Sequence, residues 1–181
     1  MFGITSNEYQ DEETPFNPQS PYAIAKVFAY YTTRYYRHTF GLHASTAIFF
    51  NHESPRRGLE FVTRKVSYGV AKIKLGLSDT LSLGNLHAER DWGFAGDYVK
   101  AMWLMLQQDQ PNDYVVATGV SHSVQELVEV AFAHADLDWH DYVKIDQKLH
   151  RPAEVDRLVG NSSKARTELN WEPTVNFKKL I

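Results

Sequence analysis

A tyrosine and a lysine four residues apart carry the clearest chemical signal in this sequence. Tyr22 and Lys26 lie in the segment Ser-Pro-Tyr-Ala-Ile-Ala-Lys, residues 20–26. Residues at i and i+4 share one face of a helix, and Ser followed by Pro is a typical helix start. A helix N-terminus and a nearby cation both stabilise a phenolate, so Tyr22 could take a proton from an alcohol. The alternative is that Tyr22 only packs at the helix start while Lys26 is solvated.

A second group of polar side chains follows an apolar run. His43–Phe50 is nearly continuous in apolar residues, which is typical of a strand buried on both faces of a parallel sheet. The next segment, 51–58, is predicted to be an irregular loop that carries Asn51, His52 and Arg57. Loops at the carboxyl ends of parallel strands bind ligands in α/β proteins. These side chains could meet amides, hydroxyls or phosphates, or belong to a solvated connector.

Two further arginines are candidate anion contacts. Arg90 precedes Asp-Trp-Gly, and Arg151 stands three residues before Glu154. Guanidinium groups suit bidentate contacts with phosphate, and the Glu154 carboxylate could accept hydrogen bonds from a ribose diol. Taken singly, each of these residues is more often a surface or salt-bridge residue than a ligand contact.

Composition narrows the class of protein. The chain has 181 residues, a formal net charge of −3 and no cysteine. These values disfavour nucleic acid and polybasic membrane contacts as well as disulfides and thiolate metal sites. The eight histidines show no metal-ligand spacing, so no metal is expected. No apolar run approaches the roughly 20 residues of a membrane span. We expect a soluble, cytoplasmic protein that meets no membrane.

Helical and strand patterns alternate along the chain, which predicts an α/β fold. Helices are expected at Pro21–Thr39, closed by Gly41, and at Phe61–Leu75, Ala95–Gln108, Val124–His134 and Ser163–Leu169. Strands are expected at His43–Phe50, Thr80–Leu83, Tyr114–Ala117 and Tyr142–Ile145. A doubly wound nucleotide-binding sheet normally has a glycine-rich turn after its first strand, and this sequence contains no such turn.

In their order along the chain, these motifs resemble the GDP-mannose 4,6-dehydratase family of extended short-chain dehydrogenase/reductases. The matching segments are Ser20-Pro21-Tyr22-x-x-x-Lys26, Phe50-Asn51-His52-Glu53-Ser54-Pro55-Arg56-Arg57-Gly58, Phe61-Val62-Thr63-Arg64-Lys65, Leu83-Gly84-Asn85, Arg90-Asp91-Trp92-Gly93, Asp97-Tyr98-Val99 and Arg151-Pro152-Ala153-Glu154. The resemblance covers essentially the whole chain. The segment 51–57 is its specific part, because sugar-nucleotide epimerases usually carry a Tyr-Gly-Pro type loop there.

The resemblance implies a mechanism and a site. Tyr22 would take the proton of the mannose 4-hydroxyl while hydride passes from C4 to NADP. Lys26 would bind the nicotinamide ribose and support the tyrosine. Water would then leave across C5 and C6, and the hydride would return to C6 to give GDP-4-keto-6-deoxymannose. His52 and Arg57 match cofactor contacts. The positions that match the substrate side are Asn51, Lys65, Arg90, Arg151 and Glu154.

The sequence also departs from the family. In the family, a Ser/Thr-x-Glu segment supplies a threonine and the base for the C5 proton, and by this register it would fall just before Met1. We therefore expect the carboxyl-terminal part of the enzyme, inactive alone, without the glycine-rich amino-terminal half. About 1–50 and 88–110 would be the remainder of a doubly wound, Rossmann-like dinucleotide-binding domain. About 51–87 and 111–181 would form the smaller substrate-binding domain.

Two other readings stay open at this point. The chain could be non-catalytic and associate with a full-length paralogue or a separate amino-terminal half; the family itself forms homo-oligomers. It could also serve another nucleotide-sugar reaction of the same superfamily, such as an epimerase or reductase. The substrate expected under the leading interpretation is GDP-mannose.

Overall fold

The computed structural model of the chain describes residues 1–149, 155 and 157–181. Its α-helices are α1 (Pro21–Phe40), α2 (Val62–Lys74), α3 (Ala95–Leu106), α4 (Val124–His134), α5 (Ser163–Leu169) and α6 (Phe177–Leu180). Its strands are β1 (Thr46–Phe49), β2 (Asn51–Glu53), β3 (Leu81–Leu83), β4 (Glu89–Arg90), β5 (Trp92–Phe94), β6 (Asp113–Val116), β7 (His122–Ser123), β8 (Val143–Ile145) and β9 (Arg157–Leu158). Short 3₁₀ turns are η1 (Trp139–Asp141) and η2 (Gln147–Leu149).

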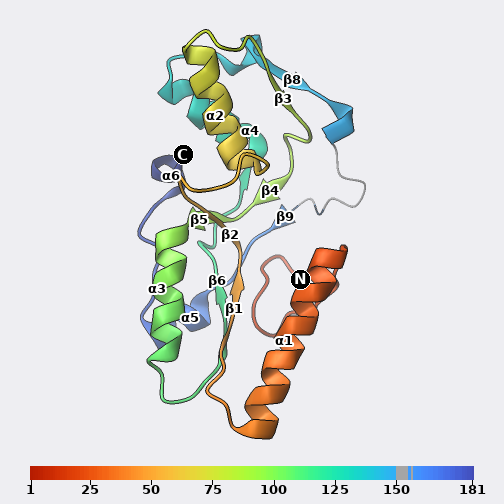
Figure 1. Ribbon diagram of the computed structural model, residues 1–181, viewed down its shortest axis with the longest axis vertical. Helices are drawn as coiled ribbons and strands as arrows, with labels where there is room; N and C mark the ends of the chain where they lie inside the picture. The colour runs from red at the N-terminus through yellow and green to blue at the C-terminus, as the bar shows by residue number, and fades with distance from the viewer. Residues whose placement is uncertain (150–154, 156) are drawn as a thin grey trace.

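Parallel strands β1 and β6 form the centre of a three-layer unit, with Thr46 opposite Asp113. Figure 1 shows β1 between α3 on one side and α1 on the other. Successive strand residues face opposite sides of a sheet. Accordingly Ile48 packs in one cluster with Tyr30 of α1, whereas Ala47 packs in another with Tyr98 of α3. Helices on both faces of a parallel sheet give the doubly wound, α/β architecture that the sequence predicts.

A second group of helices and strands, formed by α2, α4, β3 and β8, lies at the other end of the molecule (Figure 1). Helices α2 and α4 lie against each other and against the parallel pair β3–β8. Their core includes Val66 and Val70 of α2 together with Leu127, Val128 and Phe132 of α4. Helix α4 begins with the predicted capping box, in which the Ser123 side chain accepts from the backbone of Glu126 and the Glu126 side chain accepts from the backbone of Ser123.

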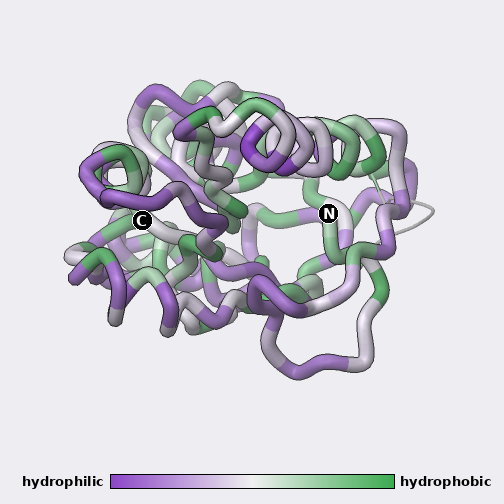
Figure 2. The backbone as a smooth tube through the Cα atoms, turned by 90° about the horizontal axis from the view of Figure 1, so that it is seen from below, coloured by the Kyte–Doolittle hydropathy of each residue, from purple (hydrophilic) through white to green (hydrophobic). Residues whose placement is uncertain are grey.

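Short strands lie between the β1–β6 unit and the group formed by α2, α4, β3 and β8. Strand β2 pairs in parallel with β5, and β4 lies between β7 and β9. None of the described helices is long and apolar enough to cross a membrane. Figure 2 accordingly shows apolar and polar residues interspersed along the chain.

The five longest predicted helices are confirmed, and Gly41 closes α1 in the left-handed conformation, with φ of 63°. The prediction of an irregular loop over 51–58 is wrong for its first three residues. They form β2, because Asn51, His52 and Glu53 find a parallel partner in β5. The expected division of the chain into two domains stays a prediction; β6, expected in the second portion, pairs with β1, expected in the first.

Candidate functional site

Tyr22 and Lys26 lie at the amino end of α1, as their spacing predicts. The Ser20 hydroxyl accepts a hydrogen bond from the Ala23 N–H at 3.1 Å, and Pro21 occupies the first helical position. Tyr22 is 72% exposed, and the Lys26 ammonium lies 5.4 Å from the centre of its ring. The cap therefore fixes a helix start that presents a phenol and a cation side by side to an incoming group. Their catalytic role stays a prediction.

His52 is held in one orientation by its neighbours. Its Nδ1 lies 2.9 Å from the carbonyl oxygen of Phe50, which can only accept, so Nδ1 carries the hydrogen in this contact. The imidazole stacks on the ring of Tyr98 and meets the ring of Phe49 edge-on, both with centroids 5.3 Å apart. In the neutral ring, Nε2 is left as an acceptor, which suits a ligand amide or hydroxyl.

Tyr98 was not predicted as a site residue, although it lies in one of the motifs that carry the resemblance. It is 1% exposed, and among the described residues its hydroxyl finds no hydrogen-bond partner. Burial, with the nearby carboxylates of Asp91, Asp97 and Glu53, raises the pKa of Tyr98. Tyr98 therefore stays neutral, and its ring packs against the face of the His52 imidazole.

Arg57 is anchored by a buried carboxylate. Its Nε lies 3.1 Å from Glu53 Oε2, an ion pair without hydrogen-bond alignment. The same carboxylate oxygen accepts from the Thr63 hydroxyl at 2.6 Å, and the Arg57 guanidinium lies 3.5 Å from the centre of the Phe61 ring. A guanidinium held in this way keeps its charge at a fixed place, as recognition of an anion requires.

Asn51 and Arg90 lie on strands of different sheets, β2 and β4, that come together at β5, the partner of β2 and the next strand after β4. Asn51 of β2 is in register with Trp92 of β5, two residues after Arg90 of β4. Arg90 pairs across the antiparallel β4–β7 ladder with His122, and its Nη1 donates to the carbonyl oxygen of Glu89 at 2.7 Å. The structure thus brings Asn51, His52, Arg57 and Arg90 onto adjoining segments. No contact found among the described residues joins them to Tyr22 or Lys26.

Asp91 is a buried residue that no sequence pattern marks as part of the site. It is fully buried, with 0% exposure, between Arg90 and Trp92. Its carboxylate accepts four hydrogen bonds: from Thr118 N at 2.9 Å, Thr118 Oγ1 at 2.6 Å, Gly119 N at 2.9 Å and Gly160 N at 3.2 Å. Burial raises the pKa of Asp91, and these hydrogen bonds oppose that rise. Asp91 therefore ties two distant segments, at Thr118–Gly119 and at Gly160, to the point where β4 meets β5.

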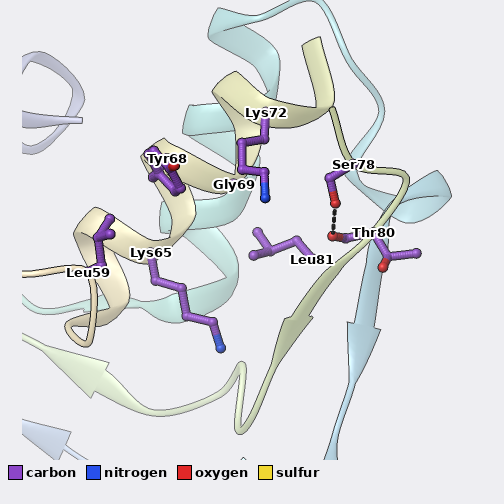
Figure 3. Close-up of a pocket in the computed structure, with 8 residues that line it drawn as sticks. All are labelled: Leu59, Lys65, Tyr68, Gly69, Lys72, Ser78, Thr80 and Leu81. Atoms are coloured by element: carbon purple, nitrogen blue, oxygen red, sulfur yellow. Dashed lines mark hydrogen bonds between the residues drawn. The ribbon is translucent and has the colours of Figure 1, made fainter. Parts of the chain in front are cut away.

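Lys65 lines a depression of about 270 Å³ on the surface of α2. Figure 3 shows Lys65 and Lys72 extending from the helix, with Ser78 and Thr80 across the opening. The remaining lining residues are Leu59, Tyr68, Gly69 and Leu81. Lys72 extends toward Ser78, whose hydroxyl donates to the Thr80 carbonyl oxygen at 3.0 Å, and Lys65 extends along the other end of the depression (Figure 3). The two ammonium groups give this depression a positive charge, which suits an anionic ligand.

The predicted substrate contacts Arg151 and Glu154 lie outside the described residues. Within residues 1–149, 155 and 157–181, no group of three or more His, Cys, Asp or Glu side chains is placed to hold a metal ion.

Solved structures similar to this one share its fold along almost the whole chain. The structure of RMD from Pseudomonas aeruginosa complexed with NADPH matches with a TM-score of 0.89 and 23% identity, over 99% of this chain and 60% of that one. A dTDP-glucose 4,6-dehydratase from Bacillus anthracis, in complex with NAD, matches with a TM-score of 0.84 and 23% identity, over 98% and 55%. The fold is therefore the Rossmann-like α/β fold of these enzymes.

Relatives found by sequence share a higher sequence identity with this chain than these solved structures do. GDP-mannose 4,6 dehydratase 2 of Arabidopsis thaliana is 57% identical over 181 residues, which are 100% of this chain and 48% of the relative. The Homo sapiens GDP-mannose 4,6 dehydratase is 48% identical over 198 residues, 100% of this chain and 53% of the relative. The chain thus spans about half the length of these relatives. The family model described as GDP-mannose 4,6 dehydratase matches residues 1–181, so the chain belongs to the GDP-mannose 4,6-dehydratase family.

Proposed function

We propose that this chain carries the proton-transferring tyrosine and the substrate side of a GDP-mannose 4,6-dehydratase. The reaction would convert GDP-mannose to GDP-4-keto-6-deoxymannose and water. The observation that carries the proposal is the capped start of α1, where the Lys26 ammonium lies 5.4 Å from the Tyr22 ring in a chain whose whole length matches this family. An exposed tyrosine that has lost its own hydroxyl proton can accept the proton of a sugar hydroxyl.

The cofactor in this proposal is NADP. When bound, this cofactor would supply reversible hydride transfer for the reaction. The donor chemistry of the chain fits such a group: the Arg57 guanidinium is fixed by Glu53 and Phe61, and His52 offers Nε2. Lys26 would hold a ribose hydroxyl beside Tyr22.

On the substrate side, Lys65 would contact the diphosphate or the nucleoside of GDP-mannose. The depression that it shares with Lys72, Ser78 and Thr80 supports an anionic ligand of this kind. Asn51 lies on β2, and Arg90 lies on β4, the strand just before β5, which is the partner of β2. Both would contact the substrate from that side, together with Arg151 and Glu154.

The chain alone is proposed not to turn over GDP-mannose. Half the length of the relatives lies outside the match, and the sequence holds no glycine-rich turn whose backbone N–H groups could bind a cofactor pyrophosphate. Full activity would then need the rest of the enzyme, in the same or a separate chain, and the active form would be an oligomer.

The substrate class is tested by titrating the purified chain calorimetrically with GDP-mannose, UDP-glucose and dTDP-glucose. GDP-mannose is expected to bind most tightly. Lys65→Ala is expected to weaken that binding by about 10- to 100-fold, since a hydrogen bond to a charged group contributes roughly 1.5–3 kcal/mol. Lys100→Ala, on the exposed side of α3, is the matched control and should leave the affinity unchanged. Preference for a uridine or thymidine sugar would instead indicate an epimerase or another dehydratase.

A further inference from the structure

Helix α2 begins without a cap from its own sequence. Its N-cap residue is Phe61, whose side chain makes no capping hydrogen bond. The start of a helix carries free N–H groups and a partial positive charge, which a carboxylate stabilises. Here a carboxylate of β2 reaches the first turn of α2, where the Thr63 hydroxyl donates to Glu53 Oε2 at 2.6 Å. Both side chains lie in the interior, since Glu53 is 5% exposed and Thr63 is 9% exposed.

The same carboxylate oxygen is also the ion-pair partner of Arg57. The Arg57 Nε lies 3.1 Å from Glu53 Oε2, and the guanidinium lies 3.5 Å from the centre of the Phe61 ring, at the residue where α2 starts. The contacts therefore close a circle from Glu53 to Arg57, on to Phe61, and through the first turn of α2 back to Glu53. The Arg57 side chain remains 23% exposed, so a ligand can reach it.

This one oxygen atom holds two parts of the site that serve different ligands in the proposed function. Arg57 is a cofactor contact, whereas Lys65, two residues after Thr63, is a substrate contact. The Lys65 N–H donates to the Phe61 carbonyl oxygen at 2.8 Å, so the position of Lys65 follows from how α2 starts. A buried carboxylate needs partners to offset its loss of water, and Glu53 has one on each side of the site.

We propose that Glu53 is a positioning residue for both ligands: it fixes Arg57 for NADP and, through Thr63, fixes the start of α2 and thus Lys65 for GDP-mannose. This inference rests on the proposed function, which assigns the two ligands. Glu53 acts through these residues and not on the ligands themselves. Its two connections are separable, because one is an ion pair and the other is a hydrogen bond from a neutral hydroxyl.

Glu53→Gln tests the connection to Arg57. Glutamine keeps an oxygen that can accept from Thr63, but it has no charge to hold the guanidinium. The protein is this chain combined with the part of Arabidopsis thaliana GDP-mannose 4,6 dehydratase 2 outside the match, and NADPH fluorescence reports binding. NADPH affinity should fall by about 2- to 10-fold, the size of one net hydrogen bond, and the affinity of the chain for GDP-mannose should not change. Loss of a negative charge alone would strengthen binding of an anionic cofactor, so an equal or higher NADPH affinity would overturn the inference.

Thr63→Val tests the connection to α2. Valine keeps the shape of the side chain and removes the hydroxyl, while the Glu53–Arg57 pair remains. Affinity for GDP-mannose, measured by calorimetric titration of the chain, should fall by about 2- to 10-fold, with NADPH affinity unchanged. Thr63→Ser, which keeps a hydroxyl, is the matched control and should bind GDP-mannose as the unchanged chain does. A general loss of structure would weaken both ligands in both variants, and that result would contradict the inference.

Hydrogen exchange in the chain alone, followed by NMR, gives a readout that needs neither ligand. The Arg57 Nε is buried, and its hydrogen should exchange faster in Glu53→Gln than in the unchanged chain, with the Lys65 N–H unaffected. Thr63→Val should instead speed exchange at the Lys65 N–H. Unchanged exchange in both variants would overturn the inference. Failure of the proposed function would appear differently, as a folded chain that does not bind GDP-mannose while these exchange rates still change.

Discussion

Tyr22→Phe is expected to lower the turnover of GDP-mannose by about 10²- to 10⁴-fold, the range typical for loss of a general acid–base group. The measurement is product formation with NADP⁺ by the chain combined with the complementary portion of the enzyme. Phenylalanine keeps the ring beside Lys26 and the start of α1, and it removes only the hydroxyl that would exchange the proton. Substrate affinity in calorimetric titration should therefore change little.

The matched control is Tyr35→Phe, which removes an exposed hydroxyl from the same helix far from its amino end. Its turnover should equal that of the unchanged chain. Retention of full turnover by Tyr22→Phe would mean that another group moves the proton, and the assignment of the tyrosine would be wrong.

Asp91→Ala is expected to destabilise the chain by about 3–5 kcal/mol, because it leaves several buried donors without an acceptor. The backbone N–H groups of Thr118, Gly119 and Gly160 all donate to the Asp91 carboxylate. Alanine cannot accept from any of them. The free energy of unfolding in urea, measured for the variant and the unchanged chain, gives the difference directly.

Asp79→Ala provides the comparison for this effect. Asp79 is exposed in the turn before β3, so its loss should change the free energy of unfolding by about 0.5 kcal/mol or less. If Asp91→Ala lowered the free energy of unfolding as little as Asp79→Ala, the hydrogen bonds of Asp91 at the junction of β4 and β5 would not be a main source of stability.

The sequence was sufficient to predict the long helices and the capping residues at their starts. The start of α1 was predictable because Ser20 and Pro21 are local signals, and the same holds for the capping box of α4. Tyr22 and Lys26 could then be placed on one face, since the geometry of a helix is the same wherever it occurs.

The two-residue strands and the buried hydrogen-bond contacts could not be predicted in this way. Strands of two residues, such as β4 and β7, have no periodicity to detect and exist only because a partner strand is present. The hydrogen-bond partners of Asp91 lie 27 to 69 residues along the chain. The contact between His52 and Tyr98 likewise depends on the packing of α3 against the β2 strand, and no local pattern indicates it.

The most direct test of the central claim is a comparison of GDP-4-keto-6-deoxymannose formation from GDP-mannose and NADP⁺ in three samples: this chain alone, the complementary portion of the enzyme alone, and the two together. Product should form only in the combined sample, and this chain alone should bind GDP-mannose without converting it. Sustained product formation by the chain alone would contradict the account. So would a folded chain that does not bind GDP-mannose, together with an assembled complex that forms no product.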